Sequence, residues 1–168
     1  MESMSDYSST IFNLVEYEIW CNLRAIDFLA GLPEADCRRD FGFGLRTPLR
    51  TMSHIADVMR GWSGCVGPEI VKPVWQSEDD SMTLQQIREK IVAVGESWLR
   101  AARTSHAQGL LDQQRRLNQV FHLVTHGTHH RGQLLSMIKL MGHPQPFEGG
   151  DFGGWSNAPA GPAPGGDR

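Results

Sequence analysis

The sequence predicts an all-α protein, a four-helix bundle followed by an irregular tail rich in glycine and proline. Four segments carry apolar residues at the spacing of a helix face, with capping or stop residues at their ends. No segment alternates apolar and polar residues as a half-buried strand does. Amphipathic helices without a sheet bury their apolar faces against one another. We therefore expect one bundle domain over residues 1–148 and an irregular or disordered tail over residues 149–168.

The first helix is expected over Thr10–Ala30, where apolar residues recur at helical spacing. Ser9 or Thr10 would cap its beginning, and Gly31 and Pro33 supply stop signals after it. Further along, the stretch DFGFGLRTP is expected to be an ordered loop, because glycines and a proline interrupt it while its aromatic side chains favour burial.

The second helix is expected to begin near Pro48, since a proline in the first helical turn loses no hydrogen bond. It should end within Gly61–Gly67. Thr83 then opens a third helix in a capping-box pattern with Gln86, and this helix is expected to end before Ser105–Gly109. Its apolar residues form a stripe, which indicates one face turned towards the core.

The fourth helix is expected to begin at about Asp112 or Leu117 and to end at Leu140, because Gly142 and Pro144 follow as stop signals. It contains the stretch HLVTHGTHHRGQ, which holds four of the seven histidines of the chain. The concentration of histidine in one helix raises the question of a metal site.

Three of these histidines, His122, His126 and His130, follow one another at intervals of four and form one column on the helix surface. His129 is turned away from His130 by about 100°. Two imidazoles four residues apart can bind one divalent ion, although such a pair by itself more often reflects ordinary packing. His54 in the second helix, taken alone, is more typical of a hydrogen-bonded core histidine. Together with His126 and His130 it completes a three-histidine site between facing helices.

Two neighbours are candidate catalytic residues, each with an alternative. Asp57 lies three residues after His54 on the same face, so it could orient a ligand or act as a base, or it could be a solvated or helix-pairing carboxylate. His122 extends the histidine column by one turn and could line a substrate pocket, or it could serve in packing.

Other residues near the histidines have structural interpretations. Arg131 and Gln133 are expected to face away from His130, in a structural position or a dimer contact. Gly127 and Gly132 are expected to permit close helix approach, which would explain glycine inside a helix. The tryptophans of the helices are expected in the core: Trp20, Trp62 and Trp98.

Composition excludes several classes of protein. The net charge of −3 and the pI near 6.1 argue against a nucleic-acid or anionic-membrane binder. The only paired basic candidates, Arg38–Arg39 and Arg115–Arg116, are more typical of solvated helix ends. Cys21, Cys37 and Cys65 form no C-x-x-C pair and have no context of a nucleophile, as expected in a reducing cytoplasm. Without a visible signal peptide or membrane span, we expect a cytoplasmic protein.

Three stretches together resemble the DinB family of bacterial metal-binding four-helix bundles: EYEIWCNLRAIDFLAGLPEAD, LRTMSHIADVMRGW and HLVTHGTHHRGQLLSMIKLMGHPQP. The resemblance spans roughly Tyr7 to Asp151, and its most specific piece is the H-x-x-x-H-R-G-Q motif. It implies that His54, His126 and His130 bind a divalent metal.

Three imidazole ligands would leave a coordination position open, as in a catalytic site. Relatives of this fold include thiol transferases and thiol-dependent isomerases, so the resemblance implies a metal-dependent transferase or isomerase that activates a small thiol. Zinc, nickel or iron would suit imidazole ligands. The alternatives are a metal-dependent hydrolase, a non-catalytic metal-binding stress-response protein, and a bundle whose histidines serve only packing and dimerisation. Relatives are often homodimers, which is also expected here, with a small molecule as substrate.

Overall fold

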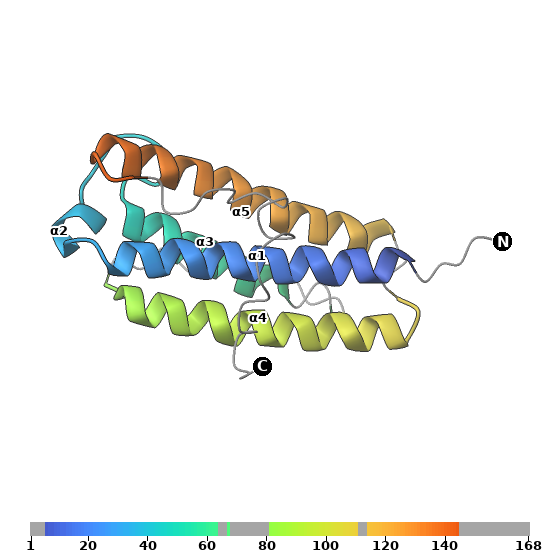
Figure 1. The fold of residues 1–168 in the computed structure, drawn as a ribbon. Coiled ribbons are helices and arrows are strands. Elements are labelled where there is room, and N and C mark those ends of the chain that lie inside the picture. The colour runs from blue at the N-terminus through green and yellow to red at the C-terminus, as the bar shows by residue number, and fades with distance from the viewer. Residues whose placement is uncertain (1–5, 64–66, 68–80, 111–113, 145–168) are drawn as a thin grey trace.

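The computed structural model describes residues 6–63, 67, 81–110 and 114–144. Within these residues the secondary structure is entirely helical (Figure 1). The four long helices lie side by side, and a short helix lies at one end of the bundle. The elements are α1 (Asp6–Ala30), α2 (Glu34–Cys37), α3 (Pro48–Ser63), α4 (Leu84–Ala107) and α5 (Gln114–Leu140). Each long helix contacts at least two others, with α1 and α3 both packed between α4 and α5. The predicted four-helix bundle is confirmed.

Two helices extend further than the sequence predicts. Helix α1 begins at Asp6, so Ser9 and Thr10 lie inside it instead of capping it. Serine and threonine are tolerated within helices, so they locate a helix end only approximately. Helix α4 continues to Ala107 and buries Ser105 completely. Gly109 (φ +66°) follows the end of the helix. Its N–H donates to the His106 carbonyl, and the N–H of Leu110 donates to the Ser105 carbonyl.

The predicted start of the second helix, the capping box of the third and the end of the fourth are confirmed. Helix α3 begins at Pro48, and the Thr47 hydroxyl accepts a hydrogen bond from the backbone N–H of Arg50 at 3.1 Å. Thr83 and Gln86 form the reciprocal capping box of α4. Helix α5 ends at Leu140, with Gly142 in the left-handed conformation (φ +82°).

Between α1 and α3, the chain is ordered as predicted, and it adds the short helix α2. The loop over residues 40–47 is closed by backbone hydrogen bonds from Phe41 N–H to Arg46 O (2.8 Å) and from Arg46 N–H to Phe43 O (2.9 Å). Its glycines Gly42 and Gly44 have positive φ, and Arg46 does as well (φ 74°). The turn therefore requires glycine at these two positions, because glycine adopts positive φ without steric cost.

The core runs along the bundle axis and draws on all four long helices. Trp98 of α4 is fully buried, as predicted, whereas Trp20 and Trp62 are half-buried at its margin. No described helix is both long and apolar enough to cross a membrane. The largest fully buried side chains are Ile19, Ile26 and Leu29 of α1, Met52, Ile55 and Met59 of α3, Ile87, Ile91 and Trp98 of α4, and Leu134 and Met137 of α5.

Candidate metal centre

The predicted histidine triad comes together between α3 and α5. One ring nitrogen from each of His54, His126 and His130 lies within 4.8 Å of the corresponding nitrogen of the other two. The Nε2 atoms of His54 and His126 are 3.3 Å apart. All three side chains are half-buried, so the cluster is held by the bundle and still reachable from its surface.

Helix geometry explains this convergence. His126 and His130 occupy consecutive turns of α5, and their ring centroids are 4.4 Å apart. His54 projects from the neighbouring helix α3, with its ring 5.1 Å from that of His126 and 4.7 Å from that of His130. The column that the spacing predicted on α5 is thus completed by one residue from α3.

The arrangement fits a divalent metal ion. Two nitrogens bound to one tetrahedral zinc ion at about 2.0–2.1 Å lie about 3.3 Å apart, which matches the separation of the His54 and His126 nitrogens. Three neutral imidazoles form a donor set that suits zinc, nickel and iron. A protonated imidazole has no lone pair for a ligand bond, so the protonation state decides whether the set can bind.

Burial keeps the central imidazole neutral. The pKa of His126 is lowered to about 4, first because burial penalises the charged ring and then because His130 and His54 would add like charges beside it. At neutral pH His126 is therefore in the form that binds metal.

Gln133 contacts the triad, contrary to the prediction that it faces away. Its Oε1 lies 3.0 Å from Nδ1 of His130, and its Nε2 lies 3.0 Å from Nε2 of His129. Because the amide oxygen only accepts, this contact places the proton of His130 on Nδ1 and leaves Nε2 for a ligand bond. Residues three apart are neighbours on a helix surface, and this spacing could have identified Gln133.

The backbone of Gly44 packs closely against the side chain of Gln133. A Cβ atom on Gly44 would lie 2.7 Å from Oε1 of Gln133, so a larger residue there would push the amide aside. The loop over residues 40–47 therefore packs against the outer hydrogen-bond partner of His130.

Arg131 is structural, as predicted, and it is buried. Its Nη1 donates to Oε1 of Glu18 at 2.8 Å and to Oδ1 of Asn22 at 2.7 Å, joining α5 to α1. Gly127 permits this approach, because a Cβ atom there would overlap Oε1 of Glu18. Close helix approach was predicted at both Gly127 and Gly132. The prediction is wrong for Gly132, which is exposed and would have no neighbouring atom within 4 Å of an added Cβ.

Asp57 points to α4. Its Oδ1 lies 2.5 Å from Nζ of Lys90 and 3.5 Å from Nη2 of Arg60, and its side chain is buried. Of the two alternatives that the sequence left open, the geometry supports the helix-pairing carboxylate.

His122 and His129 flank the triad. His122 is exposed, with its ring centroid 4.5 Å from that of Trp62 and 5.6 Å from that of His126. It lies at the edge of the cluster, where packing against Trp62 and access to a substrate are both compatible with its position. His129 is exposed, with its ring centroid 5.0 Å from that of His130 and its Nε2 3.0 Å from Nε2 of Gln133.

The basic pairs and the cysteines lie outside the cluster. Arg38 pairs with Glu34 on α2, whereas Arg116 is buried and donates to the carbonyl of Gly67, so it is not a solvated helix end. Cys21 and Cys37 are buried, and Cys65 lies outside the described residues.

A comparison with known families supports the histidine site. The model of the DinB family matches residues 4–152, most of the chain and all three histidines. No curated protein matches the chain.

Proposed function

Because the chain belongs to the DinB family, we propose that it binds one divalent metal ion through His54, His126 and His130. We further propose that it is a metal-dependent transferase or isomerase acting on a small thiol. The proposal of metal binding is supported by the convergence of three imidazole nitrogens within 4.8 Å of one another. The proposal of transferase or isomerase activity is supported by the resemblance to thiol-using relatives of this fold.

The side chains around the cluster have definite tasks in such an enzyme. His126 stays neutral at pH 7 because its pKa is lowered, and Gln133 fixes the orientation of His130 through Nδ1. Half-burial leaves one side of the cluster accessible to a substrate. A bound divalent ion would supply Lewis acidity, which lowers the pKa of a thiol or water that binds it.

A metal-dependent hydrolase is the second candidate, since the same open position accepts water. A hydrolase commonly uses a carboxylate or histidine as a general base near the metal. The candidate carboxylate, Asp57, is engaged by Lys90. His122, with its ring 5.6 Å from that of His126, is the nearest alternative base on the same helix column.

Elemental analysis of the purified protein tests the metal site. We expect about one metal ion per chain, and sharply less after His54→Ala, His126→Ala or His130→Ala. His106→Ala is the matched control, because His106 lies on α4 and packs against Phe12. His129→Ala should also retain the metal. Stoichiometric metal in the triad variants would refute the site.

Turnover assays then separate the candidate functions. The metal-loaded protein and its metal-free form are compared with thiols plus electrophiles, and with ester substrates. Metal-dependent thiol consumption supports the transferase, and metal-dependent ester hydrolysis supports the alternative. Stoichiometric metal without either activity would favour a non-catalytic metal-binding protein.

A further inference from the structure

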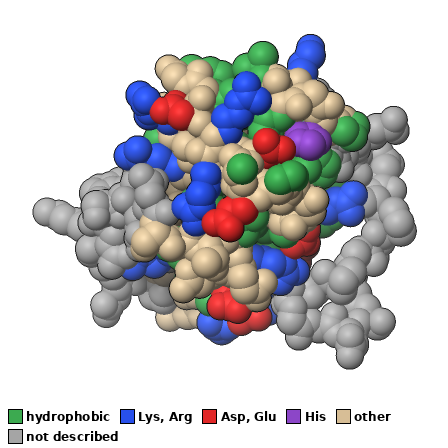
Figure 2. All heavy atoms as spheres, turned by 90° about the vertical axis from the view of Figure 1, so that its left-hand side faces the viewer, with side chains coloured by type: hydrophobic (Ala, Val, Ile, Leu, Met, Phe, Trp, Pro, Cys, Tyr) green, Lys and Arg blue, Asp and Glu red, His purple; other side chains and the backbone are tan. Residues whose placement is uncertain are grey.

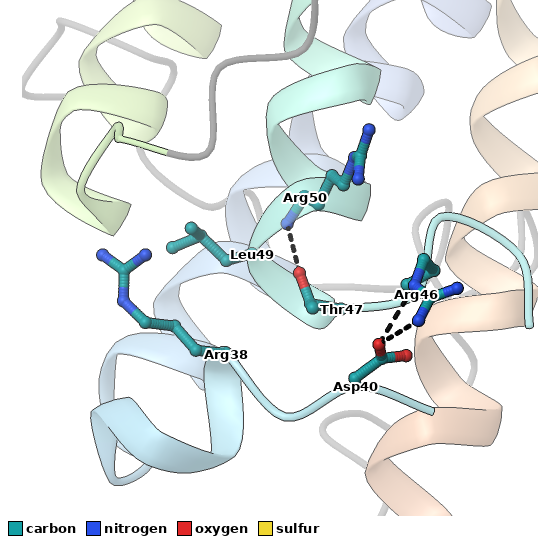
Figure 3. A pocket seen from close by; sticks show the side chains of 6 residues that line it. All are labelled: Arg38, Asp40, Arg46, Thr47, Leu49 and Arg50. Atoms are coloured by element: carbon teal, nitrogen blue, oxygen red, sulfur yellow. Dashed lines mark hydrogen bonds and ion pairs between the residues drawn. The ribbon is translucent and has the colours of Figure 1, made fainter. Parts of the chain in front are cut away.

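A cavity lies at the end of the bundle where the loop over residues 40–47 enters α3. Its volume is about 310 Å³, within the lower range of small-molecule sites. Figure 3 shows the side chains that line it, which come from the end of α2, the loop and the first turn of α3. They are Arg38, Asp40, Arg46, Thr47, Leu49 and Arg50. Figure 2 faces this end of the molecule, where basic and acidic side chains lie next to one another.

The lining of this cavity is predominantly cationic, with three arginines and one carboxylate. Arg46 donates from Nε (3.0 Å) and Nη2 (2.5 Å) to the same oxygen of Asp40. A guanidinium has five N–H donors, so this ion pair holds Arg46 in place and leaves several donors for another anion. A planar guanidinium binds carboxylate and phosphate groups well because its N–H groups form a fork.

The loop presents Arg46 at a conformational cost. Arg46 is the only non-glycine residue with positive φ in the described chain (φ 74°). Side chains other than glycine and asparagine seldom adopt this conformation, and such strain clusters at ligand-binding sites. Two hydrogen bonds of its own backbone, to Phe41 and Phe43, hold it there.

The triad histidines do not line the cavity, but two features connect its lining to the histidine cluster. Arg50 precedes His54 by four residues, so the two lie on one face of α3, about 6 Å apart along its axis. In Figure 3, Arg46 and Arg50 lie on the side of α3 that faces α5, and Arg38 and Leu49 lie on the other side. The loop also contacts Gln133 at Gly44, and Gln133 contacts His130.

We propose that Arg46 and Arg50 bind the carboxylate or phosphate group of a small molecule whose other end reaches the histidine cluster. The inference rests on the proposed function, because the cluster would bind the thiol or other metal-binding end. It adds the substrate class, a compact anion with its anionic and metal-binding groups a few bonds apart.

The test compares 3-mercaptopropionate with 2-mercaptoethanol, which has the thiol without the carboxylate. In the metal-free protein, NMR follows the Nε–H signals of Arg46 and Arg50 during titration. In the cobalt-loaded protein, the thiolate-to-cobalt absorption band gives the Kd of each thiol. The variants are Arg50→Gln and Arg46→Asn, because asparagine tolerates positive φ. Arg88→Gln is the control, since Arg88 is a similarly exposed arginine paired with Asp27 on α1.

We expect the acid, and not the alcohol, to shift both arginine signals saturably in the metal-free protein. The cobalt-loaded protein should bind the acid about tenfold more tightly than the alcohol, as a charge-assisted hydrogen bond predicts. That ratio should fall towards one in Arg50→Gln and Arg46→Asn and stay unchanged in Arg88→Gln, with cobalt content equal in all. Competition by sodium acetate and by sodium phosphate at equal ionic strength identifies the preferred anion.

The two proposals fail differently. Equal affinity for the two thiols in the cobalt-loaded wild type, or the absence of saturable arginine shifts, would overturn the anion site even if cobalt binds. Saturable shifts in a protein that binds no cobalt would support the anion site and contradict the metal function.

Discussion

Gln133 shows how much a single side chain can contribute beside a metal ligand without being a ligand. Its amide oxygen fixes the proton of His130 on Nδ1, and its amide nitrogen reaches His129. Gly44 leaves just enough room for that amide. The orientation of one triad residue thus depends on a residue one turn later and on the loop between α2 and α3.

Replacing Gln133 by leucine should weaken metal binding without removing a ligand. Loss of an outer hydrogen-bond partner typically costs about 10–100-fold in metal affinity. Competition with a chromogenic chelator measures this change. Gln85→Leu is the control, since Gln85 is an exposed glutamine whose side chain bonds only to Glu89 one turn along α4. Equal metal affinity in the two variants would contradict the orienting role of Gln133.

The lowered pKa of His126 predicts a pH-dependent stability of the metal-free protein. The unfolded chain protonates His126 near 6.5, whereas the folded chain does so only near 4. Between these values the unfolded state binds the additional proton, so the free energy of unfolding falls as the pH falls from about 6.5 towards about 4. Urea unfolding in the presence of a chelator measures the slope, which should be smaller in His126→Gln. An unchanged slope would show that His126 is not responsible.

The sequence was sufficient to predict the three triad histidines, whereas it misplaced Gln133 and left the role of Asp57 open. The spacing of His126 and His130 follows from helix geometry alone, and His54 was a lone histidine on an apolar helix. Gln133 was expected to face away from His130, although residues three apart meet on a helix surface, as the spacing of His54 and Asp57 had been interpreted. Whether Asp57 faces the triad or Lys90 depends on how α3 is rotated against α4, and a single sequence does not contain that rotation.

At the level of helices, α1 and α5 are joined by a buried polar contact that needs a glycine. Glu18 and Arg131 are 113 residues apart in the chain and form an ion pair with almost no exposure. Asn22 connects to both, and its Nδ2 also donates to Sδ of Met59 on α3. This pairing was not predictable, because the residues belong to helices whose relative register is set only by packing.

Gly127→Ala should destabilise the protein, since the added Cβ would overlap Glu18 and force α5 away from α1. Overpacking in a core typically costs about 1–3 kcal/mol. Gly132→Ala is the matched control on the same helix, where the added Cβ meets nothing and should stabilise by up to about 1 kcal/mol. Urea denaturation measures both changes in the free energy of unfolding. A Gly127→Ala variant as stable as the wild type would refute the close approach.

Glu18→Leu should be more destabilising than the loss of a surface ion pair, because it leaves Arg131 buried without its carboxylate. Removing one partner of a buried pair costs about 3–5 kcal/mol. The double variant Glu18→Leu with Arg131→Met should recover much of this loss, because no charge then remains buried. Asp27→Leu is the control, since the Asp27–Arg88 pair is exposed and such pairs contribute about 0–1 kcal/mol.

For the whole molecule, local signals in the sequence were sufficient to predict the fold. Four periodic segments, with start signals at Pro48 and Thr83 and a stop signal at Gly142, account for the four long helices. The short helix α2 was not predicted, because four residues are too few to show a period. The tail over residues 149–168 lies outside the described residues, so its structure stays a prediction. The homodimer also stays a prediction, which sedimentation equilibrium at micromolar concentration tests.

The metal site links two helices that lie far apart in the chain, so metal binding should stabilise the whole bundle. His54 belongs to α3 and the other two ligands belong to α5. A ligand that binds only the folded state raises the free energy of unfolding by about 2.7 kcal/mol at a free concentration 100 times its Kd. Zinc should therefore raise the Tm of the metal-free protein, in a concentration-dependent manner. Neither His54→Ala nor His130→Ala should show this rise, whereas His106→Ala should retain it. A zinc-dependent rise in Tm that persists in both triad variants would mean that the stabilising ion binds elsewhere.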